Sequence, residues 1–396
     1  MTNKDPEDIS VAKLIGIGLL TRLVLDTGVQ IFFPYISLIA QGLNTTEAAV
    51  GRLVSLRSIM GLTSPLFGAF ADRQGYRWTM RVGLVFAAVG FLLIGLSQTI
   101  WVAMLGMVLN GVGIFAFGPS LQAYLSNLLP YSKRARGLGI LEYAWALAGI
   151  VGLFVVGYLI SATSWRVPFY LFAGLLGIAA VWYGRLPAAK RPQVHEPWRF
   201  SWRQIPRFFA LGGNQRSTYA VIVCGTMLMF AAVNLFITYG TWLGREYGLE
   251  AVALGTVALV MGVSDLVGSV SVSVIGDWLG KKRSVWLGAG ASAVFFALLP
   301  LFNQGVVAAV AGMVLARGAF EFAVVSNMTL LSEQAPTQRA KTLTLGAAGG
   351  LIGGTAAGFT GPVAYATYGA TGIALLGAVG MALVCLINWL LVVEAE

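Results

Sequence analysis

Long apolar stretches alternate with short polar stretches along almost the whole chain. A helix that crosses a membrane needs about 20 mostly apolar residues, and twelve stretches meet this requirement. They comprise residues 14–39, 48–70, 80–98, 101–127, 138–160, 167–184, 218–240, 251–275, 285–302, 306–331, 342–365 and 370–392. The pattern predicts an all-α membrane protein with twelve transmembrane helices.

One polar stretch is much longer than the others and divides the spans into two groups of six. It carries an excess of Lys and Arg, is interrupted by prolines, and has aromatic residues between its cations. Two interpretations fit: a short amphipathic segment on the inner leaflet, or a basic linker that only enforces topology. We divide the chain into an N-terminal six-helix half (1–184), a cytoplasmic basic linker (185–217) and a C-terminal six-helix half (218–396).

Two short turns, at residues 72–77 and 277–282, are near copies of each other. Each has Asp, then Gly three residues later, then a cation two residues after that. The sequence Gly-Met-Val-Leu also occurs twice, at 106–109 and 312–315. The shared spacing indicates two pseudo-symmetric halves, which is the usual build of a secondary transporter. The glycine of each turn is expected to permit a tight bend.

Composition and charge place the chain in the membrane. Hydrophobic residues make up 57% of it and charged residues 11%, about half the charged fraction of a soluble domain. The net charge of +10 lies in short loops between spans, as orientation signals do, so we expect no nucleic-acid partner. Lys and Arg concentrate on the side that holds both termini and the linker. This predicts a multi-pass protein of the inner (plasma) membrane with cytoplasmic N- and C-termini.

The reactive residue types argue against an enzyme. Cys224 and Cys385 lie inside apolar stretches, and the only histidine, His195, lies in the linker. A single His without Cys partners is not a metal site, and no nucleophile–base set or phosphate-binding loop is present. A sensor is also disfavoured, because the sequence shows no soluble effector domain. We therefore expect no metal and no cofactor, with a proton gradient as the energy source.

Seven ionisable residues fall well inside the predicted spans. Each costs at least about 2.5–3.5 kcal/mol if it faces lipid, so we expect them to face a central cavity or one another. Two pairs are four residues apart, which puts each pair on one helix face. The seven residues are Arg22, Asp26, Arg57, Glu142, Asp265, Arg317 and Glu321.

These buried charges are the candidate chemistry. We predict that Asp26 or Glu321 carries a coupling proton, with Asp265 as a third candidate. The alternative is that the charges are permanently paired and only hold the helices in register. Glu142 lies near the cytoplasmic end of its span and is expected to pair with Arg134 or Arg136. Candidates for the substrate cavity are Arg22, Arg57, Asn110, Asn234, Arg317 and Tyr143.

The first turn resembles the signature between the second and third helices of the major facilitator superfamily, Gly-x-Leu-Ala-Asp-Arg-x-Gly-Arg-Arg. Phe70 and Tyr76 depart from it. The resemblance covers the whole chain and implies that both turns latch the halves together when the protein opens outward; the alternative is a turn that only fixes topology. The matching residues are Gly68, Asp72, Arg73, Gly75 and Arg77, and the second copy keeps Asp277, Gly280, Lys281 and Lys282.

Within this superfamily the chain is closest to bacterial proton-coupled efflux members. Residues 25–34, from Leu-Asp-Thr to Pro, are similar to a first-helix pattern of drug exporters. Met107 and Asn110 replace the Arg and Gln of the family's fourth-helix pattern, and the exporters' fifth-helix Gly-Pro is missing. The resemblance implies a monomer that exports a small organic solute by proton coupling. Alternatives are uptake, or lipid or organic-anion translocation, by the same fold; a membrane-embedded enzyme or a non-transporting sensor is disfavoured.

Overall fold

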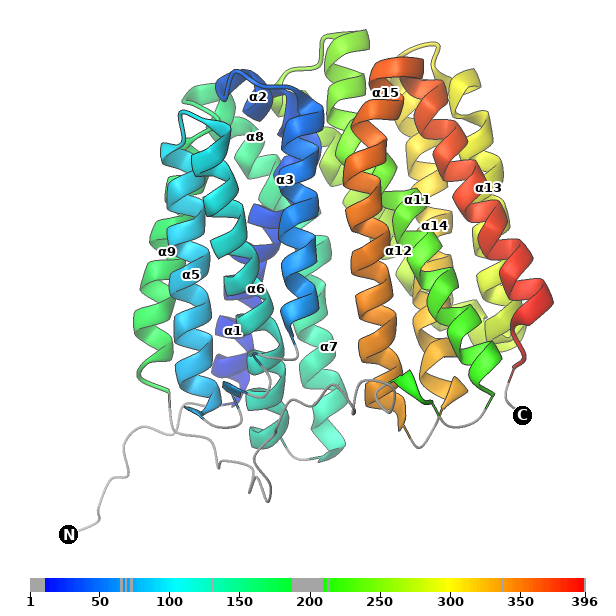
Figure 1. Ribbon diagram of the computed structural model, residues 1–396, viewed down its shortest axis with the longest axis horizontal. Helices are drawn as coiled ribbons and strands as arrows, with labels where there is room; N and C mark the ends of the chain where they lie inside the picture. The colour runs from blue at the N-terminus through cyan, green and yellow to red at the C-terminus, as the bar shows by residue number, and fades with distance from the viewer. Residues whose placement is uncertain are drawn as a thin grey trace.

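The computed structural model describes residues 11–64, 67, 70–71, 74–129, 131–186, 209–211, 214–335 and 338–394. Within these ranges all regular structure is helical, and the helices form two bundles that stand side by side (Figure 1). Helix α1 starts, and α15 ends, at the same end of the molecule, which we call the terminal side. The opposite end is called the far side.

The bundle formed first along the chain is called the N-half, and it contains the predicted first six spans. Its helices are α1 (Val11–Gln30), α2 (Phe32–Gly42), α3 (Glu47–Met60), the short helix η1 (Gly61–Thr63), α5 (Tyr76–Leu96), α6 (Ile100–Leu128), α7 (Tyr131–Leu147), the π-helical η2 (Ala148–Gly152), α8 (Leu153–Ala162) and α9 (Val167–Tyr183).

The second bundle, the C-half, has fewer but longer helices. They are α11 (Gln215–Tyr247), α12 (Ala251–Leu279), α13 (Lys281–Phe302), α14 (Val306–Gln334) and α15 (Arg339–Leu391). Helix α15 contains two predicted spans, 342–365 and 370–392, joined at Gly369. This residue has φ +58° and ψ −147°, a conformation that favours glycine and turns the chain back on itself.

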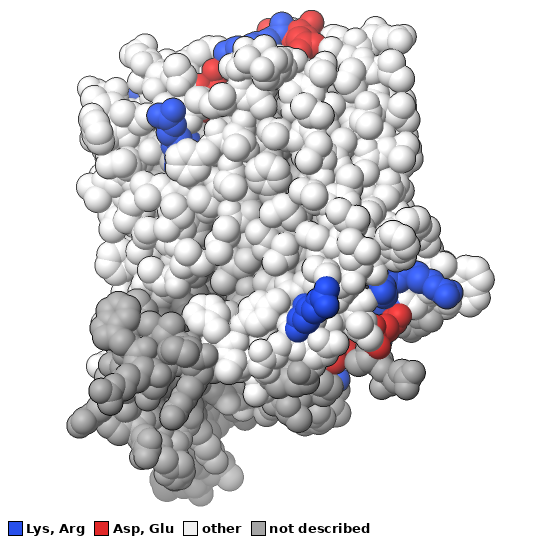
Figure 2. Space-filling model, turned by 45° about the vertical axis from the view of Figure 1, so that its right-hand side comes forward, with Lys and Arg blue, Asp and Glu red and all other residues white. Residues whose placement is uncertain are grey.

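By length and apolar character, eight helices of the described chain are able to cross a membrane, and α1 with α2 makes a ninth as a bent pair. Helix α9 is apolar but has only 17 residues, and α15 provides two spans instead of one. The second predicted span, 48–70, corresponds to the 14-residue helix α3 and to η1, and part of it lies outside the described residues. In the part of the chain that the structure describes, each predicted span is mainly helical. On the face in Figure 2, charged side chains gather near the two ends and leave an uncharged band between them, as expected for a lipid-facing surface.

The first span is broken where the sequence predicts a continuous helix. Helices α1 and α2 meet at Ile31 with a bend of 56°. Pro34 explains the break, because it has no N–H for the carbonyl of Gln30 and its ring crowds that carbonyl. Tyr35, just after Pro34, also departs from helical geometry (φ −109°, ψ 16°).

The two copied turns have the same backbone conformation. Gly75 begins α5 with φ +98° and ψ 143°, and Gly280 begins α13 with φ +80° and ψ 147°. Side chains are strongly disfavoured at these angles, which confirms that both glycines permit the turn. Gly68, Asp72 and Arg73 lie outside the described residues, and so does the side chain of Asp277.

The halves are sealed together on the far side. Helix α2 packs against α11 so closely that a Cβ on Gly240 would lie 2.1 Å from the carbonyl oxygen of Pro34. Arg245 of α11 forms an ion pair with Glu47 of α3, with Nη2 to Oε1 at 2.5 Å. Ser37 and Thr241 share a hydrogen bond of 2.8 Å across the same seam.

Candidate functional site

A cavity of about 480 Å³ lies between the halves, on the terminal side of this seal. Its wall is mostly apolar with a few polar groups, as in many binding sites for small organic molecules. Both halves contribute, through Arg22, Asp26, Val29, Phe33, Val54, Arg57, Ser58, Ile114, Phe115 and Trp145, and through Val221, Ile222, Gly225, Met229, Val233, Val324, Asn327, Met328, Leu331, Leu343, Gly346, Ala347, Gly350, Leu351 and Gly354.

Asp26 and Arg22 form a loose pair on the cavity wall. Arg22 Nε lies 3.7 Å from Asp26 Oδ2, whereas Arg22 Nη1 lies only 2.5 Å from Glu142 Oε1 on α7. Asp26 is 8% exposed, and its Oδ2 has no hydrogen-bond partner among the described residues. The Arg22 guanidinium is therefore shared between two carboxylates and is held more closely by Glu142.

Arg57 is the second unusual cation of the cavity. It is 4% exposed, and Nη2 donates to the Val29 carbonyl at 3.1 Å. The guanidinium lies 5.2 Å from the centroid of the Phe32 ring. Its Nη1 finds no partner in the described part of the chain, nor does any described carboxylate lie within 4.0 Å of the side chain.

The C-half also contributes to the cavity a side chain with a buried polar atom that lacks a described hydrogen-bond partner. Asn327 of α14 donates from Nδ2 to the Val221 carbonyl at 3.3 Å, while its Oδ1 is buried without a described partner. Unpartnered atoms of Asp26, Arg57 and Asn327 thus belong to one cavity. Buried polar atoms usually have partners, so a polar ligand in this cavity would satisfy them.

A second charged cluster lies in the C-half and does not line the cavity. Arg317 of α14 binds Asp265 of α12 through two contacts of 2.5 Å, Nε to Oδ1 and Nη2 to Oδ2. The guanidinium also lies 4.0 Å from the centroid of the Phe236 ring. Glu321 accepts a hydrogen bond from Ser269 at 2.8 Å. The i,i+4 spacing of Arg317 and Glu321 does not produce a salt bridge, because Arg317 reaches across to α12.

Three further predicted cavity residues lie outside the cavity wall in this conformation. Asn110 is fully buried and donates to the Ala87 carbonyl at 3.4 Å, tying α6 to α5. Asn234 accepts from Thr360 at 3.0 Å, tying α11 to α15. Tyr143 is 58% exposed and is not part of the wall. These two asparagines satisfy polar groups between neighbouring helices.

Among the described residues, Glu142 pairs with Arg22, a partner that the sequence did not suggest. It binds Arg22 and also accepts from Gln122 Nε2 at 3.2 Å. The side chains of Arg134 and Arg136, the expected partners, lie outside the described residues. The interhelix contact brings Glu142 into the network around Asp26, which its place near a span end did not reveal.

The described turn residues contact their own half or the first residues of the linker. Arg77 Nη1 donates to the Leu186 carbonyl at 2.8 Å, and Lys282 Nζ donates to the Val392 carbonyl at 2.6 Å. Lys281 forms an ion pair with Glu333 of the same half. None of these contacts joins the two halves in this conformation, so the latch role stays a prediction.

Asn327 is the functional candidate that the sequence did not single out. It is an asparagine inside the predicted tenth span, at 306–331. Its polar amide in an apolar stretch is the sequence feature that could have identified it as a candidate. Serines and threonines inside spans usually bond their own helix, as Ser326 does to the Phe322 carbonyl at 2.7 Å. An asparagine is harder to satisfy in that way, because it carries both donors and acceptors.

Comparison with known proteins agrees with the fold. The family model of the Major Facilitator Superfamily matches residues 18–344. The chain belongs to this superfamily, and it is a membrane transporter rather than an enzyme.

Relatives of known sequence are distant. The Bacillus subtilis (strain 168) protein named "Uncharacterized MFS-type transporter YwfA" is 24% identical over 343 residues, which cover 82% of this chain and 80% of the relative. Multidrug resistance protein 1 of the same organism is 28% identical over 165 residues, covering 41% of this chain and 42% of the relative. Multidrug resistance proteins are therefore among the similar sequences.

Solved structures support the fold alone. The D-xylose-proton symporter aligns with a TM-score of 0.75 at 18% identity, covering 96% of this chain and 97% of the symporter. A bacterial homologue of the human lysosomal transporter Spinster, in an inward-facing and occupied conformation, aligns with a TM-score of 0.72 at 16% identity. That alignment covers 97% of this chain and 95% of the homologue.

Proposed function

We propose that this transporter exports a small organic solute in exchange for protons, and that Asp26 carries the coupling proton. The observation that carries the proposal is that Asp26 Oδ2, on the wall of the central cavity, has no hydrogen-bond partner among the described residues. A coupling carboxyl group must exchange a proton and must lie where solute and solvent reach it. Asp26 alone among the three candidate carboxylates lines the cavity.

The geometry of the ion pairs separates Asp26 from the other candidates. Asp265 is bound to Arg317 through two contacts of 2.5 Å, and such a pair is costly to break inside a membrane. Asp26 has only the looser 3.7 Å contact to Arg22. When Asp26 takes up a proton, Arg22 keeps its closer partner Glu142. After the change of charge at Asp26, Arg22 therefore still has a carboxylate partner.

The arrangement of the halves supports alternating access. The far side is closed by helix packing and by the pair Arg245–Glu47, while the cavity extends toward the terminal ends of α14 and α15. Transporters of this type rock one half against the other around a site near the membrane midplane. The multidrug resistance proteins among the relatives favour export as the direction.

The test uses the full chain in proteoliposomes with an imposed pH gradient. Lipophilic cations, organic anions, sugars and lysolipids are screened for gradient-driven accumulation. We expect Asp26→Asn to lose accumulation of the transported solute but to retain solute–solute exchange, because exchange needs no proton. Glu321→Gln is the matched control and should still accumulate solute. Accumulation by Asp26→Asn at the parent rate would refute the role of Asp26.

A further inference from the structure

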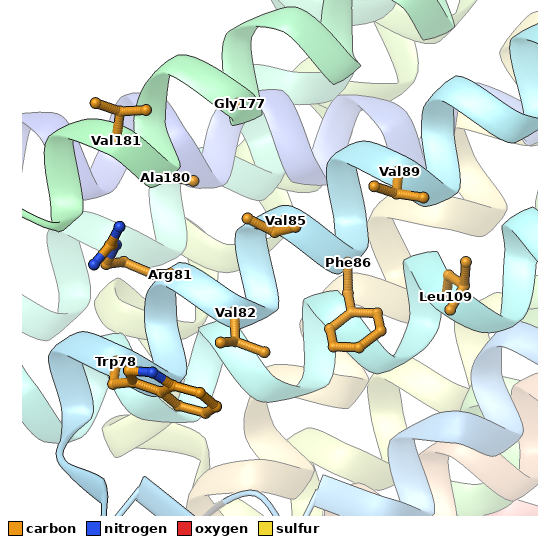
Figure 3. Close-up of a pocket in the computed structure, with 10 residues that line it drawn as sticks. All are labelled: Trp78, Arg81, Val82, Val85, Phe86, Val89, Leu109, Gly177, Ala180 and Val181. Atoms are coloured by element: carbon orange, nitrogen blue, oxygen red, sulfur yellow. The ribbon is translucent and has the colours of Figure 1, made fainter.

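A second hollow lies on the outer surface of the N-half, on the side away from the C-half. It has a volume of about 420 Å³ and runs between α5 and α9, with one residue from α6 (Figures 1 and 3). We call it the α5–α9 groove. Its lining residues are Trp78, Arg81, Val82, Val85, Phe86, Val89, Leu109, Gly177, Ala180 and Val181.

The groove matches the depth of one membrane leaflet. It extends along α5 from Trp78 to Val89, about three helical turns or roughly 16 Å at 1.5 Å per residue. The hydrocarbon core of a bilayer is about 30 Å thick, so one leaflet is about half of that. On the α9 side the lining residues Gly177 and Ala180 are small, so little side-chain volume fills the groove there (Figure 3). A single apolar chain is therefore the shape of ligand that the groove fits.

One end of the groove carries a cation that no described residue neutralises. Arg81 is exposed, and no ion pair or hydrogen bond joins it to the described residues. Its guanidinium lies between α5 and α9 and rests on Gly184, where a Cβ would come within 2.9 Å of Arg81 Cζ (Figure 3). Trp78, which is 45% exposed, lies at the same end, the terminal side of α5.

The duplicated half offers a natural comparison. Trp78 and Arg81 follow Gly75 by three and six residues, and Arg283 and Trp286 follow Gly280 at the same two positions in reverse order. Arg283 and Trp286 are also exposed. However, neither of them lines the outer groove between α12, α13 and α14. Arg283 is thus an exposed cation at the matched position that does not line that groove.

We propose that the α5–α9 groove binds an anionic phospholipid from the leaflet on the terminal side. One acyl chain lies along Val82, Val85 and Val89, and the phosphate binds the Arg81 guanidinium, whose planar donors suit phosphate oxygens. Trp78 sits at the headgroup level, where tryptophan is favoured. Basic sites beside transmembrane helices recognise anionic headgroups in this way. The site does not depend on the transported solute.

The test measures lipid binding to the purified full chain by native mass spectrometry. Phosphatidylglycerol is titrated against phosphatidylcholine of the same acyl chains. We expect the parent protein to prefer phosphatidylglycerol roughly fivefold at one site, the amount that one interfacial cation provides. Arg81→Gln should abolish this preference, whereas Arg283→Gln should keep it.

A second variant tests the apolar part of the groove without changing any charge. A Cβ on Gly177 would meet nothing within 4 Å, so the side chain of Gly177→Leu enters the groove and not the core. We expect this variant to lose the site for both lipids and to keep the parent melting temperature. Equal binding of the two lipids by the parent, or equal losses in Arg81→Gln and Arg283→Gln, would overturn the proposal.

Discussion

Arg57 is a residue whose expected contribution to solute binding differs from its contribution to stability. A buried cation without a carboxylate partner is expensive in a membrane, yet Arg57 is held against Phe32 and the Val29 carbonyl with one terminal nitrogen unpartnered. Such a residue contributes little to folding. Its position on the cavity wall gives it a use only when a solute supplies the missing acceptor.

We therefore predict opposite effects of Arg57→Gln on binding and on stability. The glutamine amide retains a donor for the Val29 carbonyl but removes the charge, so the melting temperature in detergent should stay equal or rise. The apparent affinity for the transported solute should fall about tenfold or more, the loss expected for a charged hydrogen bond. Arg52→Gln, an exposed change on the same helix, should alter neither. A lower melting temperature with unchanged affinity would show that Arg57 is structural.

At the scale of helices, the sequence predicted positions better than partnerships. Arg22 and Asp26 are four apart and do meet, because they share one helix. Arg317 and Glu321 have the same spacing, but Arg317 turns to Asp265, which is 52 residues away in sequence. The i,i+4 spacing shows which residues share a helix face, but it does not show which residues of a neighbouring helix that face contacts. The pair Arg22–Glu142 and the placement of Asn327 needed the packed structure for the same reason. The bend after Gln30, by contrast, follows from Pro34, which is present in the sequence.

The pair Arg317–Asp265 ties α14 to α12. We predict that the two side chains are strongly coupled in their effect on the free energy of unfolding. Either Arg317→Gln or Asp265→Asn leaves one buried charge alone, which costs about 3–5 kcal/mol. The double variant removes both charges, so its unfolding free energy should exceed that of either single variant. Chemical denaturation in detergent measures this double-mutant cycle. Additive losses in the double variant would mean that the two side chains do not depend on each other.

At the scale of the whole molecule, the duplication into two halves is visible in the sequence. The conformational state, closed on the far side, is not. The copied turns predicted two halves, and Gly75 and Gly280 adopt matching backbone angles. Which side of the molecule is closed depends instead on contacts between helices remote in sequence, such as α2 with α11. The far-side seal includes the 2.8 Å bond between Ser37 and Thr241, and no local pattern predicts it. The seal is therefore the place to test alternating access.

Gly240 is the tightest contact of this seal, and its substitution should shift the conformational balance. A Cβ at this position would lie 2.1 Å from the Pro34 carbonyl oxygen and 2.5 Å from its carbon. These are backbone atoms, so the far side has to separate before the methyl group fits. Gly240→Ala should therefore favour the conformation that is open on the far side. Gly244→Ala is one turn further along α11, and the nearest atom to its Cβ would be 3.7 Å away.

The readout is a single cysteine at Ser37, introduced after Cys224 and Cys385 are replaced by serine. Ser37 is half-buried in this conformation, so a membrane-impermeant maleimide applied from the far side should label this cysteine faster when the seam opens. We expect Gly240→Ala to raise the labelling rate several-fold, and Gly244→Ala to label at the parent rate. The seal opens against the Arg245–Glu47 pair, which is exposed at Arg245 and so contributes only about 1 kcal/mol or less. Steric conflict at Gly240 is larger than that, so an unchanged labelling rate would mean that the far side does not open by separating α2 from α11.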